Sequence, residues 1–220
     1  MIKQLIFDCD GVLVDSEILA TRVLLKKLYA HGFEFEEKDF IQTFTGQQTS
    51  QILTNLFTQK GKEAPEGFVE EVDKGMWQVM ESELEPIKQV KNTLTQMSLP
   101  KAVVSNSTLP WVQRSLKVAD IHHLFDEKLF VANMVENPKP APDVYLFAAE
   151  KLKVQPEECL VVEDSPSGAT AALSAGMKVI GFLGASHILD GHDEKLMDRG
   201  VEHLAKDMDE LLLRVNELVN

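Results

Sequence analysis

Two aspartates stand two residues apart at the end of the first apolar run of the chain. Asp8 and Asp10 follow the run at residues 5–7. Side chains two residues apart in a strand lie on the same side of the backbone, so these carboxylates converge. Ligands of open α/β sheets bind beyond the carboxyl ends of the strands, which is where this pair lies. For a bare Asp-x-Asp, however, acids that only mark a strand end and a turn are the alternative interpretation.

Polar residues also follow two later apolar runs. Ser105 and Asn106 come after one run, and Glu163 and Asp164 come after another. Viewed alone, Ser105 and Asn106 are typical of a helix cap or turn, and Asp164 is typical of a helix N-cap. Their position after buried strands makes all four residues candidates for the same site as the aspartate pair.

Lys139 is a candidate cation for that site. It lies between prolines in the segment 137–143, Asn-Pro-Lys-Pro-Ala-Pro-Asp. A lysine in a loop is normally solvated, but the prolines restrict the backbone, and Pro142 with Asp143 opens the next helix. The formal charge of the chain is −13, so a site for an anion needs local positive charge. Lys139 supplies it.

The string at residues 7–17, Phe-Asp-Cys-Asp-Gly-Val-Leu-Val-Asp-Ser-Glu, closely resembles the first motif of the haloacid dehalogenase-like superfamily. The three later segments resemble the second, third and fourth motifs of that superfamily, in order. The resemblance implies that Asp8 attacks phosphorus and becomes an aspartyl phosphate, a known form of covalent catalysis by a carboxylate. It implies that Asp10 protonates the leaving oxygen and later takes a proton from water. It also implies a set of phosphate-binding residues: Ser105, Asn106 and Lys139.

The resemblance further implies a magnesium ion. Its ligands are expected to be Asp8, the Asp10 carbonyl and Asp164, with Glu163 bound directly or through water. Hard oxygen ligands suit Mg²⁺, which keeps several waters and binds through a few carboxylates plus substrate phosphate.

Within the superfamily, the chain is similar to the branch of beta-phosphoglucomutase and of sugar- and polyol-phosphate phosphatases, including a phosphogluconate phosphatase. The mutase holds a second phosphate with an arginine and a serine-lysine pair, and the matching positions here are Thr49, Ser107 and Thr108. Neutral threonines offer neither a bidentate fork nor an ammonium. These positions favour a phosphatase acting on a small phosphorylated sugar, polyol or sugar acid. A mutase and an inactive binding or regulatory member of the fold are the alternatives, although every motif acid is present.

The pattern of apolar runs predicts the elements that position these residues. Buried strands are expected at residues 5–7, 102–104, 129–131, 160–162 and 179–182. Helical patterns alternate with the later strands at residues 109–118, 144–152 and 167–175. Such alternation is typical of an α/β fold with a Rossmann-like parallel sheet and helices on both of its faces.

An insertion separates the first predicted strand from the second. Roughly ninety residues lie between them, far more than a crossover needs. Helical spacings at residues 17–31, 49–60 and 68–82 predict a small all-helical cap domain at residues 16–82, inserted into an α/β core of residues 1–15 and 83–220. By analogy, the polar turn of this cap faces the site and reads the substrate. The expected specificity residues are Gly46, Gln47, Gln48, Thr49 and, in the core, Ser107; a simple helix cap at Thr49 is the alternative.

Composition limits the other partners. The charge of −13 disfavours nucleic acid and anionic membranes, and no apolar run approaches the length of a membrane span. Cys9 and Cys159 are expected to be reduced core residues of a cytoplasmic protein. Because His187 and His192 lack a standard zinc spacing, surface or packing roles are favoured for them. We expect a monomer or weak homo-oligomer with a small phosphorylated substrate.

Overall fold

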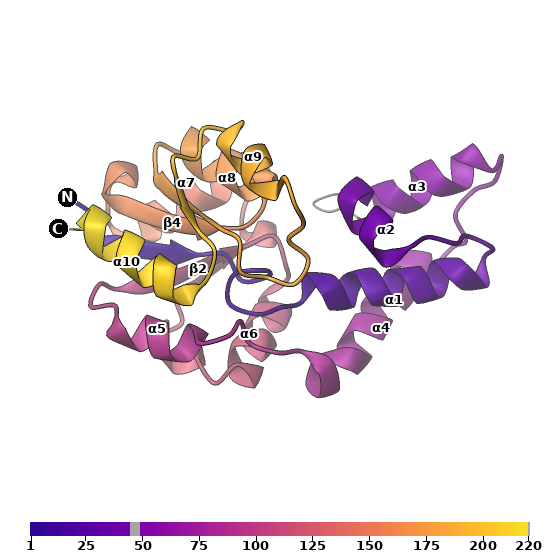
Figure 1. The fold of residues 1–220 in the computed structure, drawn as a ribbon, viewed down its shortest axis with the longest axis horizontal. Coiled ribbons are helices and arrows are strands. Elements are labelled where there is room, and N and C mark those ends of the chain that lie inside the picture. Colours follow the sequence, from indigo (N-terminus) through magenta and orange to yellow (C-terminus); the bar gives the residue numbers. More distant parts are fainter. Residues whose placement is uncertain (45–48, 220) are drawn as a thin grey trace. The chain divides into compact units, whose positions relative to one another are not determined.

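The computed structural model describes residues 1–44 and 49–219, and they divide into two compact units (Figure 1). One unit joins Met1–Ser16 to Glu85–Asn220, and the other is Glu17–Leu84. The bounds of the second unit are close to those predicted for the inserted helical domain at residues 16–82. That this unit acts as a cap stays a prediction.

The larger unit contains a parallel sheet with the strand order β3-β2-β1-β4-β5-β6 among the described residues. The strands are β1 (Gln4–Phe7), β2 (Lys101–Ser105), β3 (Leu129–Val131), β4 (Cys159–Glu163), β5 (Lys178–Phe182) and β6 (His203–Ala205). All five predicted strands are present. The sequence missed β6, because an edge strand of three residues with half-buried His203 and Leu204 carries too short an apolar run to be recognised.

The order of the strands places β1 at the centre of the sheet. The chain first builds outward from β1 through β2 to β3, and then returns to build β4, β5 and β6 on the other side. Phe7 is in register with Val103 of β2 and with Val162 of β4. The carboxyl ends of β1, β2 and β4 therefore meet at one edge of the sheet, at a topological switch point where open α/β sheets bind ligands.

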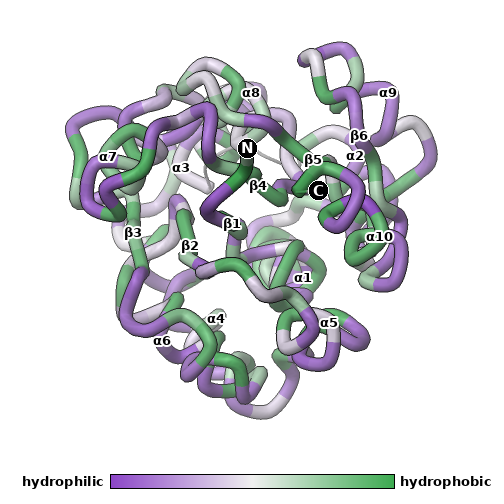
Figure 2. Tube along the Cα trace, turned by 90° about the vertical axis from the view of Figure 1, so that its left-hand side faces the viewer, coloured by the Kyte–Doolittle hydropathy of each residue, from purple (hydrophilic) through white to green (hydrophobic). Residues whose placement is uncertain are grey.

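Helices cover both faces of the sheet: Figure 2 shows α7 and α8 on one side, and α5, α6 and α10 on the other. This arrangement confirms the predicted α/β fold class. The helices of this unit are α5 (Val90–Gln96), α6 (Leu109–Val118), α7 (Asp143–Leu152), α8 (Pro166–Ser174), α9 (His192–Met197) and α10 (Met208–Val219), with 3₁₀ turns at His122–Leu124, Ala132–Met134 and Pro156–Glu158.

Helix α8 shows why a helix begins directly after β4. The side chain of Ser165 accepts a hydrogen bond from the Gly168 N–H at 3.0 Å and so caps the helix. Pro166 occupies the first turn, where a missing N–H costs nothing. The turn between β4 and α8 is therefore short, and it keeps Glu163 and Asp164 at the edge of the sheet.

The smaller unit is helical. It contains α1 (Glu17–Ala30), α2 (Glu37–Phe44), α3 (Thr49–Gln59) and α4 (Phe68–Glu83). The three predicted helices are present, and α2 was missed because its eight residues are fewer than the window of about 11 residues over which helical spacing is recognised. Phe33 and Phe40 are 6% and 3% exposed and belong to the core of this unit.

Several predictions from composition can be compared with the described residues. Within residues 1–44 and 49–219, no helix combines the length and the apolarity of a membrane span.

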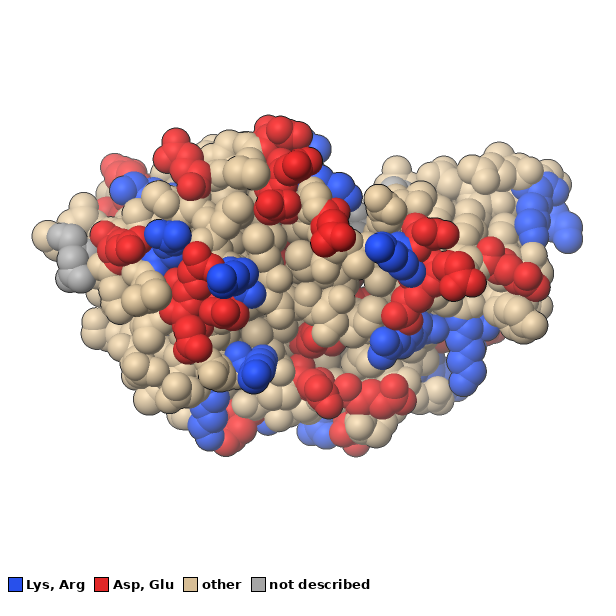
Figure 3. All heavy atoms as spheres, viewed as in Figure 1, with Lys and Arg blue, Asp and Glu red and all other residues tan. Residues whose placement is uncertain are grey.

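Cys9 and Cys159 are buried free thiols, as predicted. Burial raises the pKa of Cys159 to about 11, so this thiol stays protonated at neutral pH. On the face shown in Figure 3, lysines and arginines lie among aspartates and glutamates.

Candidate active site

The first predicted site residue, Asp8, directly follows the central strand β1. Its backbone N–H donates to the Val162 carbonyl at 3.0 Å and so extends the pairing of β1 with β4 by one residue. The register places Asp8 beside Glu163, the last residue of β4. The side chain of Asp8 is buried, with 8% of the residue exposed.

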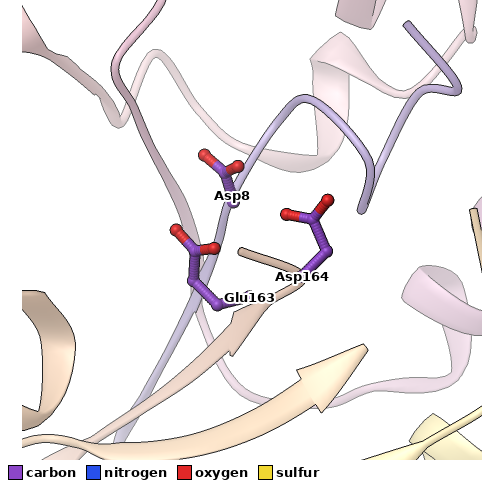
Figure 4. A group of neighbouring side chains, drawn as sticks. All are labelled: Asp8, Glu163 and Asp164. Atoms are coloured by element: carbon purple, nitrogen blue, oxygen red, sulfur yellow. The ribbon is translucent and has the colours of Figure 1, made fainter. Parts of the chain in front are cut away.

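Three buried acids form a group at this edge of the sheet. Asp8, Glu163 and Asp164 each offer an oxygen within 4.8 Å of the others, and Figure 4 shows their carboxylates around a common space. Burial raises the pKa of Asp8 and of Asp164 well above the ordinary range, and the charge of Glu163 raises both further. Ionised carboxylates at this spacing need positive charge nearby. Lys139 supplies part of it.

Lys139 lies inside the acidic group. Its Nζ donates to Asp8 Oδ1 at 2.9 Å, to Glu163 Oε1 at 2.7 Å and to the Val104 carbonyl at 2.9 Å. Burial alone lowers the pKa of a lysine, but Asp8 and Glu163 outweigh it and raise the pKa of Lys139 well above its usual value. Three carboxylates less one ammonium leave an excess of two negative charges when all are ionised. A divalent cation matches that excess.

Asn106 holds the backbone of Lys139 in place. Its side-chain amide donates to the Lys139 carbonyl at 3.1 Å and accepts from the Lys139 N–H at 3.0 Å. The sequence implied a phosphate-binding role for Asn106, which rests on its backbone N–H. The structure adds a positioning role for the side chain. Its two hydrogen bonds to the backbone of Lys139 connect the loop after β3 to the end of β2.

Glu163 is the anchor of Lys139. Its Oε1 accepts from Lys139 and from the Tyr145 hydroxyl at 3.1 Å, and its Oε2 accepts from the Ser165 N–H and hydroxyl at 3.1 and 3.0 Å. A Cβ at position 168 would lie 1.7 Å from Glu163 Oε1, so only Gly168 leaves room for the carboxylate. Although Glu163 belongs to the acidic group, its oxygens are already engaged by four donors.

Asp10 has a different environment from Asp8. Its Oδ1 accepts from the Ser16 hydroxyl at 2.6 Å and from Trp111 Nε1 at 3.0 Å. Its Oδ2 accepts from the Ser107 hydroxyl at 2.6 Å and from the Ser105 hydroxyl at 3.4 Å. Asp8 thus contacts an ammonium and other acids, whereas Asp10 contacts hydroxyls and an indole. The expected specificity residue Ser107 faces Asp10 in this structure.

Two histidines enclose Asp164. His187 Nε2 lies 3.1 Å from Asp164 Oδ2, and His192 Nε2 lies 2.6 Å from the Asp164 carbonyl oxygen. His187 and His192 are 3% and 7% exposed, so a surface role is wrong for both. Both follow β5, whose carboxyl end lies at the same edge as the other site residues. That position was the signal in the sequence that could have indicated them.

The structure brings most of the predicted site residues together in the larger unit. These are Asp8, Asp10, Ser105, Asn106, Ser107, Lys139, Glu163 and Asp164. Thr49 is the first residue of α3 in the smaller unit. Gly46, Gln47 and Gln48 lie outside the described residues. Sequence reasoning missed Ser16, Trp111, Tyr145, Gly168, His187 and His192 as members of the site.

Chemically, the arrangement offers a buried carboxylate beside an ammonium, with a second carboxylate held separately by neutral donors. This combination suits attack by Asp8 on an electrophile whose negative charge Lys139 neutralises. Asp10 is then available to move a proton.

Known proteins have sequences and folds similar to those of this chain. The 6-phosphogluconate phosphatase of Escherichia coli (strain K12) is 30% identical over 84% of this chain and 85% of its own length. The phosphorylated carbohydrates phosphatase of Thermotoga maritima is 30% identical over 93% of this chain and 94% of its own. A conserved haloacid dehalogenase-like protein of unknown function from Agrobacterium tumefaciens str. C58 has a crystal structure that matches all of both chains, with a TM-score of 0.93 and 30% identity.

The family match covers the part of the chain from β1 to β5, including the inserted helical segment. Residues 5–182 match the family described as Haloacid dehalogenase-like hydrolase. This matched range contains all four segments, at residues 7–17, 105–107, 137–143 and 163–164. The resemblance drawn from those motifs is confirmed. This chain therefore belongs to the haloacid dehalogenase-like hydrolase family.

Proposed function

We propose that this chain is a magnesium-dependent phosphatase that hydrolyses a phosphorylated sugar, polyol or sugar acid through an aspartyl phosphate on Asp8. The observation that carries the proposal is the buried group in which Asp8 contacts Lys139 and lies within 4.8 Å of Asp164. The substrate class is supported by the names of the relatives from Escherichia coli and Thermotoga maritima, which act on 6-phosphogluconate and on phosphorylated carbohydrates.

The proposed cation ligands are Asp8, the Asp10 carbonyl and Asp164. Oxygen donors of this kind suit a hard divalent ion, and the formal excess of two negative charges fits one Mg²⁺. Glu163 contributes its charge to the group while its oxygens hold Lys139 and Ser165. When bound, Mg²⁺ supplies the positive charge that keeps Asp8 ionised and neutralises charge on the phosphoryl oxygens.

In the first half-reaction, the Asp8 carboxylate attacks phosphorus as the bond from phosphorus to the leaving oxygen breaks. Asp10 gives its proton to that oxygen, which leaves as the alcohol of the sugar, polyol or sugar acid. Lys139 stabilises the transferring phosphoryl group, together with the Ser105 hydroxyl and the Asn106 N–H. In the second half-reaction, Asp10 takes a proton from water, the water attacks phosphorus, and Asp8 is released together with inorganic phosphate.

We also propose where the substrate is selected. The helical unit Glu17–Leu84 is proposed to act as the cap that selects the substrate, with Gly46, Gln47, Gln48 and Thr49 as the readers. The uncharged polar side chains of Gln47, Gln48 and Thr49 suit the hydroxyls of a sugar or polyol.

The test is a substrate screen with purified protein and Mg²⁺. The panel contains hexose phosphates, hexitol phosphates and 6-phosphogluconate, and the measurement is the release of inorganic phosphate. We expect turnover of at least one of them, its loss in Asp8→Asn, and wild-type turnover in Asp190→Asn, a matched change at an exposed aspartate. Full turnover by Asp8→Asn would overturn the assignment of the nucleophile.

A parallel assay separates the phosphatase from the mutase. Beta-glucose 1-phosphate is incubated with the protein, and both isomer formation and phosphate release are followed. We expect release without efficient isomerisation, because Thr49 and Thr108 carry no charge for a second phosphate. Efficient isomerisation without release would contradict the proposed hydrolysis.

A further inference from the structure

Two histidines contact the acidic group from the segment that links β5 to α9 and from the start of α9. The linking segment runs from residue 183 to residue 191, and the first residue of α9 is His192. His187 and His192 are buried, and neither has a part in the proposed reaction steps. Both contact the same residue, Asp164.

His187 restricts the carboxylate of Asp164. The side chains of His187 and Asp164 are 2% and 4% exposed, and Nε2 lies 3.1 Å from Oδ2. A Cβ at Gly11 would lie 2.0 Å from the same Oδ2 and 2.9 Å from His187 Cε1. The backbone of Gly11, the carboxylate and the imidazole therefore leave no room for a side chain at position 11, and the imidazole packs directly against this side of the carboxylate.

His192 restrains the backbone of the same residue. Its Nε2 lies 2.6 Å from the Asp164 carbonyl oxygen, and because a carbonyl only accepts, Nε2 carries the hydrogen. The rings of His187 and His192 also pack edge to face, with centroids 6.2 Å apart and an interplanar angle of 87°. Asp164 is thus held at its side chain by one histidine and at its backbone by the other.

The segment is anchored immediately before His187. The Ser186 N–H donates to Asp15 Oδ1 at 3.1 Å, and the Ser186 hydroxyl donates to Asp15 Oδ2. Asp15 belongs to the same unit as Asp164, in the stretch that follows β1. This anchor fixes the direction from which the imidazole reaches Asp164.

From these contacts we propose that His187 is a positioning residue for cation binding: its Nε2–H holds Asp164 Oδ2 and presents the other carboxylate oxygen to the divalent ion. The inference rests on the proposed function, because it takes Asp164 as a cation ligand. Carboxylates that bind metals are themselves hydrogen-bonded, and the loss of such a partner typically weakens metal affinity by about 10- to 100-fold.

The experiment measures cation binding directly, without turnover. Isothermal titration of the protein with Mg²⁺, in the absence of substrate and at one pH, gives the Kd. His187→Leu fills a similar volume without a donor, and His187→Gln places an amide N–H where Nε2 was. His123→Gln is the matched control, because His123 is exposed. Thermal unfolding of each metal-free variant is recorded in parallel.

We expect His187→Leu to raise the Kd by about 10- to 100-fold, His187→Gln to recover most of the affinity, and His123→Gln to match the wild type. Saturating Mg²⁺ should return the kcat of His187→Leu towards the wild-type value, which a general loss of structure would not allow. If His187→Leu does not fold, a Kd raised by less than threefold in folded His187→Ala overturns the role.

The outcomes also separate this role from the proposed function. A wild-type Kd in folded His187→Leu, with normal Mg²⁺ binding by the wild type and none by Asp164→Asn, overturns only the role of His187. A wild-type protein that binds no Mg²⁺ overturns the proposed cation site, and the positioning role falls with it.

Discussion

Gly168→Ala is the substitution whose effect follows most directly from the packing of the site. Gly168 lies in α8, where alanine is ordinarily the better residue by about 1 kcal/mol. Here the added Cβ would lie 1.7 Å from Glu163 Oε1 and 2.4 Å from Oε2. Glu163 is 0% exposed and is held by Lys139, Tyr145 and Ser165, so its carboxylate has no nearby space to enter.

The size of the effect follows from the contacts that must break. Moving the Glu163 carboxylate away from Lys139 disrupts a fully buried ion pair, and breaking such a pair costs about 3–5 kcal/mol. Subtracting the gain of about 1 kcal/mol in helix propensity leaves a net loss of about 2–4 kcal/mol in the free energy of unfolding. With an m-value of about 3 kcal/mol per molar urea, the unfolding midpoint falls by about 1 M.

The assay is urea unfolding followed by circular dichroism, with phosphate release measured on the same preparations. Ser174→Ala is the matched control, because Ser174 is exposed on the same helix and its change should stay within about 0.5 kcal/mol. Activity of Gly168→Ala should fall as well, since Lys139 loses its anchor. A variant that is as stable as the wild type, or more stable, and fully active would refute the role given to this glycine.

Three further predictions follow from other contacts. Lys139→Met should abolish turnover and destabilise the metal-free protein by about 3–5 kcal/mol in urea unfolding, because Asp8 and Glu163 lose the ammonium between them. Unchanged stability would contradict this. Trp111→Phe should lower kcat by about tenfold, because Asp10 loses a hydrogen bond worth about 1.5 kcal/mol while an aromatic ring is kept at the position; steady-state kinetics with an unchanged kcat would show that the contact has no part in catalysis. In the metal-free protein, burial raises the pKa of Asp8 and of Asp164. The folded state therefore binds more protons than the unfolded chain, and the free energy of unfolding should fall as the pH rises from about 4 through the raised pKa values. Urea unfolding measured at a series of pH values should show this loss of stability, and Mg²⁺ should reverse it. A stability that rises with pH over that range would contradict the prediction.

Residues that follow strands were the predictable part of the site. Asp8, Ser105 and Asp164 each come directly after, or at the end of, a short apolar run, and parallel strands deliver such residues to one edge. Lys139 was predictable for another reason, since prolines mark the loop that carries it. Local sequence therefore indicated both the fold class and the acids of the site.

The missed residues act through contacts that no local pattern carries. Tyr145 is one apolar residue among several on α7, and only the folded chain reveals that its hydroxyl reaches Glu163. Trp111 meets Asp10 across 101 residues of sequence. Gly168 has an ordinary position in α8, and its requirement comes from the volume of a carboxylate that belongs to another element. Periodicity reports which face of an element is buried, not which polar atoms meet there.

The most direct test of the central claim is chemical trapping of the aspartyl phosphate. Protein is mixed with Mg²⁺ and a radiolabelled phosphomonoester that it turns over, quenched in acid within a single turnover, and digested for peptide mapping. We predict that the label lies on the peptide that contains Asp8, is released by hydroxylamine, and is absent from Asp8→Asn. Turnover at the wild-type rate without label on that peptide, or label on another residue, would contradict the assignment of Asp8 as the nucleophile.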